Sequence, residues 1–401
     1  MAVRGLLSVN KNINPDAWME RALDEFHLLP KLHQAIYQNN LENVKNLINS
    51  GCNINEKNDM GETALYFAAY FGKQKILEYL FSCVDLQVMG EYRGESELHA
   101  AARAGHIECL RLCLKNGSYI DAQSLEDNWT ALHIACFRKD TNIIRLLMEN
   151  KANTNVVAHY GYKPINLLFI LFDPQAYLIV RCLDTDLILQ CMEELLVSPY
   201  VDVNHWSFIP GRTGPFVSAN PTPLERACGI VSPDLVRLLL NNGARADGIY
   251  QKSCVRIPLL CLFHLLDTLS SFKLDTCQKI QDFQRCIELL LCHGIKNDVM
   301  QLFTRPKDYR KKTVAGARLR TITNIRQQIR KKNMEEYFPE YLKSEWKRFL
   351  SWLQFKENNV SSLKSLVRMK IRETVGHRVQ CHVKELPIPR LLKECVLLYD
   401  I

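Results

Sequence analysis

Leucines recur along much of the chain at a nearly constant spacing. Leu32, Leu65, Leu98 and Leu132 are separated by steps of about 33 residues, and Ile165 continues the series at the same spacing. Each begins a short apolar stretch with helical periodicity, and a second apolar stretch follows it and ends in a turn rich in Gly and Asn. These second stretches occupy residues 46–55, 112–122, 146–155, 238–247 and 289–298. The pattern predicts an all-α fold built from repeated pairs of short helices.

The residue types at fixed places in the repeat support this prediction. Thr63 and Thr130 stand where a helix should begin, and a threonine hydroxyl there can accept a bond from a free backbone N–H. The alanine pairs at 68–69 and 101–102 allow neighbouring helices to lie close together. Within the second stretches, glycines stand in the terminal turns at Gly51, Gly117, Gly243 and Gly294, where a helix can end in the left-handed conformation. A single pair of helices cannot bury its apolar face, so we expect the pairs to stack.

A period near 33 with a T-x-L-H motif resembles the ankyrin repeat. The segments TALYFAAYFG (63–72), ELHAAARAGH (97–106) and TALHIACFRK (130–139) align on this motif, and the resemblance implies an ankyrin solenoid of about seven repeats over residues 31–298. His99 and His133 occupy the histidine of the motif, which in ankyrin repeats ties helix ends together. We expect residues 1–30 to be an N-terminal extension.

Two repeats are longer than the others. The two halves of a repeat are close in sequence from Leu132 to Leu146, but they are about twice as far apart from Ile165 to Leu195 and again from Leu259 to Leu289. The fifth and seventh repeats therefore contain insertions, and a further expansion at residues 205–223 precedes the sixth. Such insertions project as loops from one face, often the binding face, although family drift is an equal alternative.

Large aromatic residues lie in or beside the turns between repeats. Trp129, Trp206 and Phe208 are our candidate anchors for a protein substrate, because tryptophan is enriched at the energetic centres of interfaces. The identity of that substrate cannot be read from the sequence.

A strongly basic segment follows the repeats. Residues 305–332 contain eleven Lys or Arg and one acid, for a net charge of +10, whereas the whole chain carries +8. The segment could serve nuclear import or bind an anionic partner. However, Ile322, Ile325 and Ile329 have the spacing of one helix face, so we expect a solvated amphipathic helix and no major nucleic-acid site. It belongs to a basic and helical connector over residues 299–360.

The C-terminal residues form two apolar helical stripes around a proline-containing stretch. Residues 361–378 predict a helix, and LPIP (386–389) cannot be a helix interior because proline lacks an N–H donor. A second amphipathic segment follows from residue 390. About forty residues with so little apolar volume cannot form a stable core alone, so this region requires a partner.

This order of elements resembles a SOCS box, here residues 361–401. The resemblance implies that the first helix binds elongin C through Leu363, Leu366, Val367 and Ile371. It implies that Leu386, Pro387, Ile388 and Pro389 contact a cullin, the fifth by the LPxP pattern. Val367 stands where the family has cysteine, and Cys395 where it usually has an aromatic residue. Ankyrin repeats followed by a SOCS box are the architecture of the ankyrin repeat and SOCS box family.

The resemblance implies a substrate-recognition subunit of an elongin B/C–cullin–RING ubiquitin ligase, which performs no catalysis itself. The alternative is a non-ligase ankyrin scaffold whose basic segment binds an anionic or nuclear partner. The sequence has no phosphate-binding glycine loop, HExxH, GxSxG or CxxC motif, and we expect no cofactor. His377, Cys381 and His382 lack a fourth metal ligand, so we expect no metal site.

The sequence predicts an intracellular protein. The fifteen cysteines are scattered at apolar helical positions, as in a reducing compartment. The most apolar stretch, residues 165–189, carries charged residues that a bilayer would exclude, so we expect no membrane association. We expect a cytoplasmic location, and the basic segment leaves a nuclear location open.

Overall fold

The fold is described from a computed structural model. The structure describes residues 29–58, 61–83, 94–170, 184–208, 219–246, 249–251, 254–256 and 276–293. The chain divides into two compact units, Met1–Asn220 and Pro221–Ile401. Residues 1–28, the connector with its basic segment, and the predicted SOCS box lie outside the described residues.

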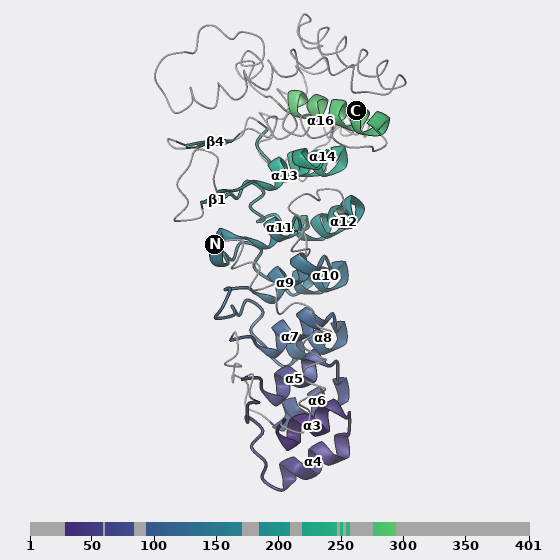
Figure 1. The fold of residues 1–401 in the computed structure, drawn as a ribbon, viewed down its shortest axis with the longest axis vertical. Helices are drawn as coiled ribbons and strands as arrows, with labels where there is room; N and C mark the ends of the chain where they lie inside the picture. Colours follow the sequence, from purple (N-terminus) through teal and green to yellow (C-terminus); the bar gives the residue numbers. More distant parts are fainter. Residues whose placement is uncertain are drawn as a thin grey trace, which may run out of the picture. The chain divides into compact units, whose positions relative to one another are not determined.

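Unit 1 consists of stacked helix pairs. The first helices of the pairs are α3 (Lys31–Tyr37), α5 (Ala64–Tyr70), α7 (Glu97–Ala104), α9 (Ala131–Arg138) and α11 (Pro164–Leu167). The second helices are α4 (Leu41–Asn49), α6 (Gln74–Cys83), α8 (Ile107–Lys115), α10 (Thr141–Glu149) and α12 (Thr185–Leu196). Each first helix contacts the next first helix, and the second helices form a parallel row (Figure 1). This arrangement confirms the predicted repeat of paired helices.

Unit 2 also contains a helix pair. The pair is α13 (Pro223–Gly229) and α14 (Pro233–Asn241), and α14 packs against α13 and against α16 (Thr276–Cys292). Two short antiparallel ladders lie in loops: β1 (Ser207–Phe208) with β2 (Ala219–Asn220) in unit 1, and β3 (Ile249–Gln251) with β4 (Cys254–Arg256) in unit 2. The sequence pattern predicted only helices; these ladders add two or three residues per strand to a helical fold.

Side-chain caps fix the helix starts at the predicted residues. The hydroxyl of Thr63 accepts a bond from the Tyr66 N–H, and that of Thr130 from the His133 N–H. Asp140 caps the second helix of the fourth repeat in the same way. Between the helices the alanines at 68–69 and 101–102 are fully buried, which permits the close packing that their size predicts.

None of the helices that the structure describes is both long enough and apolar enough to cross a membrane.

Two glycines at helix ends offer a matched test of this packing. Gly51 has φ +88° with no atom within 4 Å of an added Cβ, whereas Gly72 has φ +66° and an added Cβ would lie 2.8 Å from the His106 ring. Gly51→Ala should therefore lower the free energy of unfolding by roughly 1–2 kcal/mol from backbone strain alone. Gly72→Ala should cost about 1–3 kcal/mol more through the clash. Urea denaturation measures both.

His106→Ala provides the control for this comparison. In that background the clash is gone, so Gly72→Ala should cost no more than Gly51→Ala. An equal cost of the two glycine variants in the native background would contradict the observed contact.

Candidate functional site

Histidines join one repeat to the next inside unit 1. The Nε2 groups of His33, His99 and His133 donate to the backbone carbonyls of Glu62, Trp129 and Tyr162, at 3.0, 2.9 and 3.3 Å. Each accepting carbonyl lies 29 or 30 residues further along the chain, just before or at the start of the following repeat's first helix. In the third and fourth repeats Nδ1 also accepts the N–H of the helix cap, Ser96 or Thr130, at 3.1 Å. The predicted structural role of His99 and His133 is confirmed.

These histidines are neutral in the folded chain. Burial lowers the pKa of His33 and of His133 to about 4, and it also lowers the pKa of His99. His33 differs from His99 and His133 at its helix cap. The cap residue there is Pro30, which has no N–H, so the Nδ1 of His33 has no partner among the described residues. A second proton on His99 or His133 would occupy Nδ1 and break the bond that this atom accepts from the helix-cap N–H.

The second repeat carries tyrosine in place of the histidine. The Tyr66 hydroxyl donates to the carboxylate of Glu95 at 3.1 Å, and Arg103 forms an ion pair with the same carboxylate. The Glu95 and Arg103 side chains are only 4% and 14% exposed. Burial raises the pKa of Tyr66 well above its ordinary value, so the hydroxyl remains a donor. A buried three-residue network thus replaces the histidine bond between the second and third repeats.

In the fifth repeat the same place is held by Asn166, which accepts the Lys163 N–H at 3.1 Å. The Lys163 ammonium reaches Asp202 at 2.9 Å. Burial opposes ionisation of Asp202, but the bond from Lys163 holds its pKa below the ordinary value. The Asn155 amide oxygen accepts the Asp202 N–H at 3.1 Å, which joins the loop after α10 to the loop after α12.

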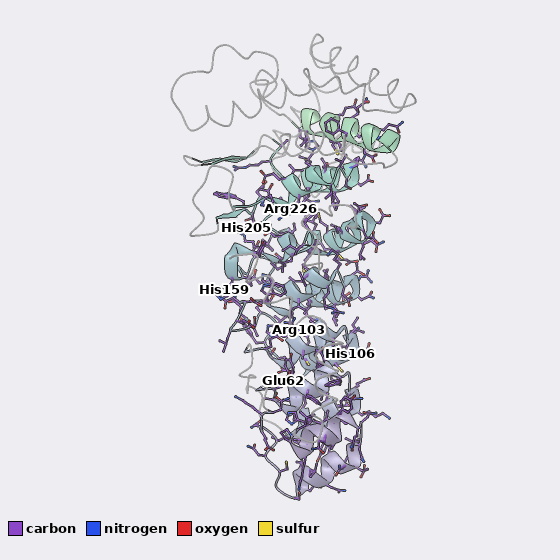
Figure 2. All side chains as sticks on the ribbon, in the orientation of Figure 1. Glu62, Arg103, His106, His159, His205 and Arg226 are labelled. Carbon is purple, nitrogen blue, oxygen red and sulfur yellow. The ribbon has the colours of Figure 1, made fainter. Side chains whose placement is uncertain are left out.

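The loops between the repeats, here called the finger loops, are joined side by side. Gln123 donates to the carbonyl of Val157 at 3.4 Å, and the His159 N–H donates to the carbonyl of Asp127 at 2.9 Å. His205 donates to the carbonyl of Gly161 at 2.8 Å. Figure 2 shows His159 and His205 on the same side of unit 1, where these loops project. The finger loops therefore form a continuous, internally bonded edge.

Trp129, a candidate anchor, is buried with 5% exposed. The centroid of its ring lies 5.2 Å from that of Phe137, and its backbone N–H donates to the Ser124 hydroxyl at 3.0 Å. The residues at the same place in other repeats, Glu62, Glu95 and Tyr162, are also buried. The repeat frame itself indicates this burial, because the residue just before the first-helix cap serves the joint between repeats in the second to fifth repeats. We therefore leave Trp129 out of the candidate surface.

The other two candidate anchors lie at the start of the expansion before the sixth repeat. Trp206 is half-buried directly before β1, and the backbone of Phe208 pairs with Ala219 across the β1–β2 ladder. The Asp202 and His205 bonds described above hold the base of this ladder.

Exposed apolar residues on the finger loops were not found from the sequence. Leu125 is 73% exposed, Val157 47% and Tyr200 77%. They lie on neighbouring loops, since Gln123 bonds to Val157 and the Asn155 amide donates to the Tyr200 carbonyl at 2.6 Å. We call Leu125, Val157, Tyr200 and Trp206 the finger surface. No sequence motif marks Leu125, Val157 or Tyr200, because the fold decides whether an apolar residue in a loop is exposed or buried.

The buried cysteines are poor nucleophiles. Burial raises the pKa of Cys113 and Cys136 well above the ordinary value of a thiol, and that of Cys109 to about 11. Within the described ranges no group of three or more His, Cys, Asp or Glu side chains could hold a metal ion. His377, Cys381 and His382 lie outside those ranges.

Two protein-family models match the chain. Ankyrin repeats, in three copies, match residues 32–124 and 82–158, and the SOCS box matches residues 359–397. Both modules predicted from the sequence are confirmed. All eight residues that we predict to contact elongin C or a cullin lie within the SOCS box match, but outside the residues that the structure describes.

Curated proteins resemble parts of the chain. It is 29% identical over 172 residues (41% of this chain, 17% of the other) to the nuclear factor NF-kappa-B p105 subunit of Gallus gallus. It is 30% identical over 159 residues (32% and 31%) to the E3 ubiquitin-protein ligase XBAT33 of Arabidopsis thaliana. It is 27% identical over 148 residues (35% and 13%) to the transient receptor potential cation channel subfamily A member 1 of Homo sapiens. The chain spans less than a third of the length of these relatives.

Proposed function

Because the chain joins ankyrin repeats to a SOCS box, and so matches the ankyrin repeat and SOCS box family, we propose that it is the substrate-recognition subunit of an elongin B/C–cullin–RING ubiquitin ligase. The observation that carries the proposal is the presence of both modules in one chain. The SOCS box holds the ligase and the ankyrin repeats hold a protein substrate. This arrangement raises the local concentration of substrate lysines near the ubiquitin-loaded enzyme.

The finger surface is our proposed substrate site. Leu125, Val157 and Tyr200 are exposed on loops that are joined by bonds from the side-chain amides of Gln123 and Asn155 to backbone carbonyls, and such preorganisation reduces the entropy lost on binding. Trp206 and Phe208 remain proposed anchors at one end of this surface.

A comparison of two forms of the protein tests the proposal. The full-length protein and a form lacking residues 359–397 are purified from cells in which the proteasome is blocked. A substrate is expected with both forms, because the repeats are intact, and its abundance in cells with an active proteasome should rise only with the shortened form. Absence of elongin C and of every cullin from the full-length purification would instead support the plain scaffold.

Leu363 should be the main anchor in elongin C, because it begins the apolar stripe of the helix that the sequence predicts for the SOCS box. Fully burying a leucine contributes about 1.5–3 kcal/mol. Leu363→Ala should therefore weaken elongin C binding by roughly ten- to a hundredfold, as measured by co-precipitation or calorimetry. Val367→Cys is the matched control, because both side chains are small and apolar, and binding should hold or improve.

Joint replacement of Leu386 and Pro387 by alanine should have a different effect. Elongin C should stay bound while the cullin, which we propose is the fifth, is lost, because the two segments face different partners. If the Leu363→Ala variant binds elongin C as tightly as the native chain does, the assignment of the two segments to elongin C and to the cullin loses its basis.

A further inference from the structure

Basic side chains gather where the first helix of each pair turns into the second. Lys73 lies in the turn between α5 and α6, His106 in the turn between α7 and α8, and Arg138 ends α9. The His106 ring lies against Gly72, where an added Cβ would meet it at 2.8 Å. His106 belongs to the repeat between those of Lys73 and Arg138. Burial lowers the pKa of His106, and the positive charges of Lys73 and Arg138 lower it further. In Figure 2 His106 lies on the other side of unit 1 from His159 and His205.

Arg138 is an exposed guanidinium in a largely cationic setting. Its Nη2 lies 3.8 Å from the position of an added Cβ on Gly105, across the turn of the preceding repeat. Partial burial of the side chain lowers the pKa of Arg138. The carboxylate of Asp140 opposes this shift, and the positive charge of Arg103 adds to it. Asp140 is already engaged as the cap of α10, where it accepts the Ile143 N–H at 3.1 Å.

The neighbouring cations differ in whether their charge is compensated. Arg103 is paired with Glu95. Lys73 and Arg138 form no salt bridge with any residue in the described ranges. Two cations without an ion-pair partner in these ranges therefore stand two repeats apart along the stack, and the carboxylate of Asp140 lies on the Arg138 side.

Aromatic side chains fill the surface beside these cations. The Phe71 ring lies 5.3 Å from that of Tyr70 and 5.2 Å from that of Tyr37, in edge-to-face contacts. All three rings are half-buried. Burial raises the pKa of Tyr70, and the positive charges of Arg103 and Arg138 oppose that shift. We call Tyr70, Phe71, Lys73, His106 and Arg138 the turn patch.

We propose that the turn patch binds an acidic, extended peptide segment of a partner protein. Two packed helix steps of about 8–10 Å separate Lys73 from Arg138, and an extended chain at about 3.3–3.6 Å per residue crosses that distance in about five or six residues. Two carboxylates with that separation pair with the two cations. Apolar residues between them pack on Tyr70 and Phe71. Carboxylates match a guanidinium in geometry as well as in charge.

The alternative anions fit this surface less well. A single phosphate is too small to reach both cations. A nucleic acid presents a dense row of phosphates, but the turn patch offers two separated cations and an acid, Asp140, beside one of them. The surface is distinct from the finger surface, so this proposal stands whether or not the chain is a ligase subunit.

Fluorescence anisotropy with the full-length protein tests the proposal. The probe is a labelled hexapeptide with glutamate at both ends and Gly-Leu-Phe-Gly between them. The matched peptide has glutamine at both ends, a third has phosphoserine at both ends, and a short single-stranded oligonucleotide is the fourth ligand. The glutamate peptide should bind at least tenfold more tightly than the glutamine peptide. Arg138→Glu and Lys73→Glu should each weaken it about tenfold.

Lys115→Glu is the matched control, because Lys115 is an exposed residue at the end of α8, outside the turn patch, and its substitution makes the same change in net charge. It should change the Kd less than twofold. Arg138→Gln and Lys73→Gln repeat the test without charge reversal, and circular dichroism verifies that each variant is folded. The proposal is overturned if the glutamine peptide binds equally well, if Lys115→Glu matches Arg138→Glu, or if the phosphopeptide or oligonucleotide binds more tightly through the same residues.

Discussion

Glu95→Ala is expected to lower the local stability of the second and third repeats by about 3–5 kcal/mol. The substitution leaves the Arg103 guanidinium, which is 14% exposed, without its carboxylate, and it leaves the Tyr66 hydroxyl without its acceptor. An unpaired buried charge costs far more than the pair contributes when intact, because its desolvation is no longer offset. Hydrogen exchange of the amides in α5 and α7 measures the loss directly.

Two comparisons separate this effect from general disruption. Glu42→Ala removes an exposed ion pair with Lys45 and should change stability by less than about 0.5 kcal/mol. Replacing Glu95 by leucine and Arg103 by methionine together removes both charges and should recover most of the lost protection. If Glu95→Ala costs no more than Glu42→Ala, the network between the repeats contributes no more than a surface ion pair does.

The repeat could be predicted from the sequence, but the partners of individual side chains could not. The spacing of Leu65, Leu98 and Leu132 and the T-x-L-H motif are local features, and they predict both the helix pairs and the role of His99 and His133. Tyr66 occupies the histidine position, but its acceptor, Glu95, lies 29 residues away in the next repeat. A bond of this kind depends on how far a side chain reaches across a packed interface.

The candidate surfaces show the same division. Trp129 has the composition of an interface anchor, but its place just before a helix cap buries it, as it buries Glu62. Leu125 and Tyr200 have no distinguishing sequence pattern, yet the loops expose them. Lys73 and Arg138 are separated by two repeats in the sequence, and only the stacking of those repeats places them along one edge.

Mild acid should unfold the repeats, because the buried histidines are neutral in the folded chain. The pKa of His33 and of His133 is lowered from 6.5 to about 4. An unfolded chain binds protons at these rings below about pH 6.5, so the stability that they contribute is fully present above that pH and is lost as the pH falls toward 4. The difference in pKa corresponds to about 3 kcal/mol for each imidazole. Urea denaturation followed by circular dichroism between pH 7.5 and 4.5 should show a falling midpoint.

The pH window identifies the groups responsible. His99, His106 and His205 also have lowered pKa values and contribute in the same direction. The Asp202 carboxyl, whose pKa is below 3.8, contributes only at lower pH. His133→Asn is the informative variant, because Asn166 at the same place in the fifth repeat accepts its cap N–H without titrating. It should be less stable at pH 7.5, but its stability should fall less steeply with pH, by up to about 1.4 kcal/mol per pH unit for one proton. An unchanged slope in this variant, or a flat midpoint between pH 7 and 5 in the native chain, would show that the buried imidazoles do not govern acid stability.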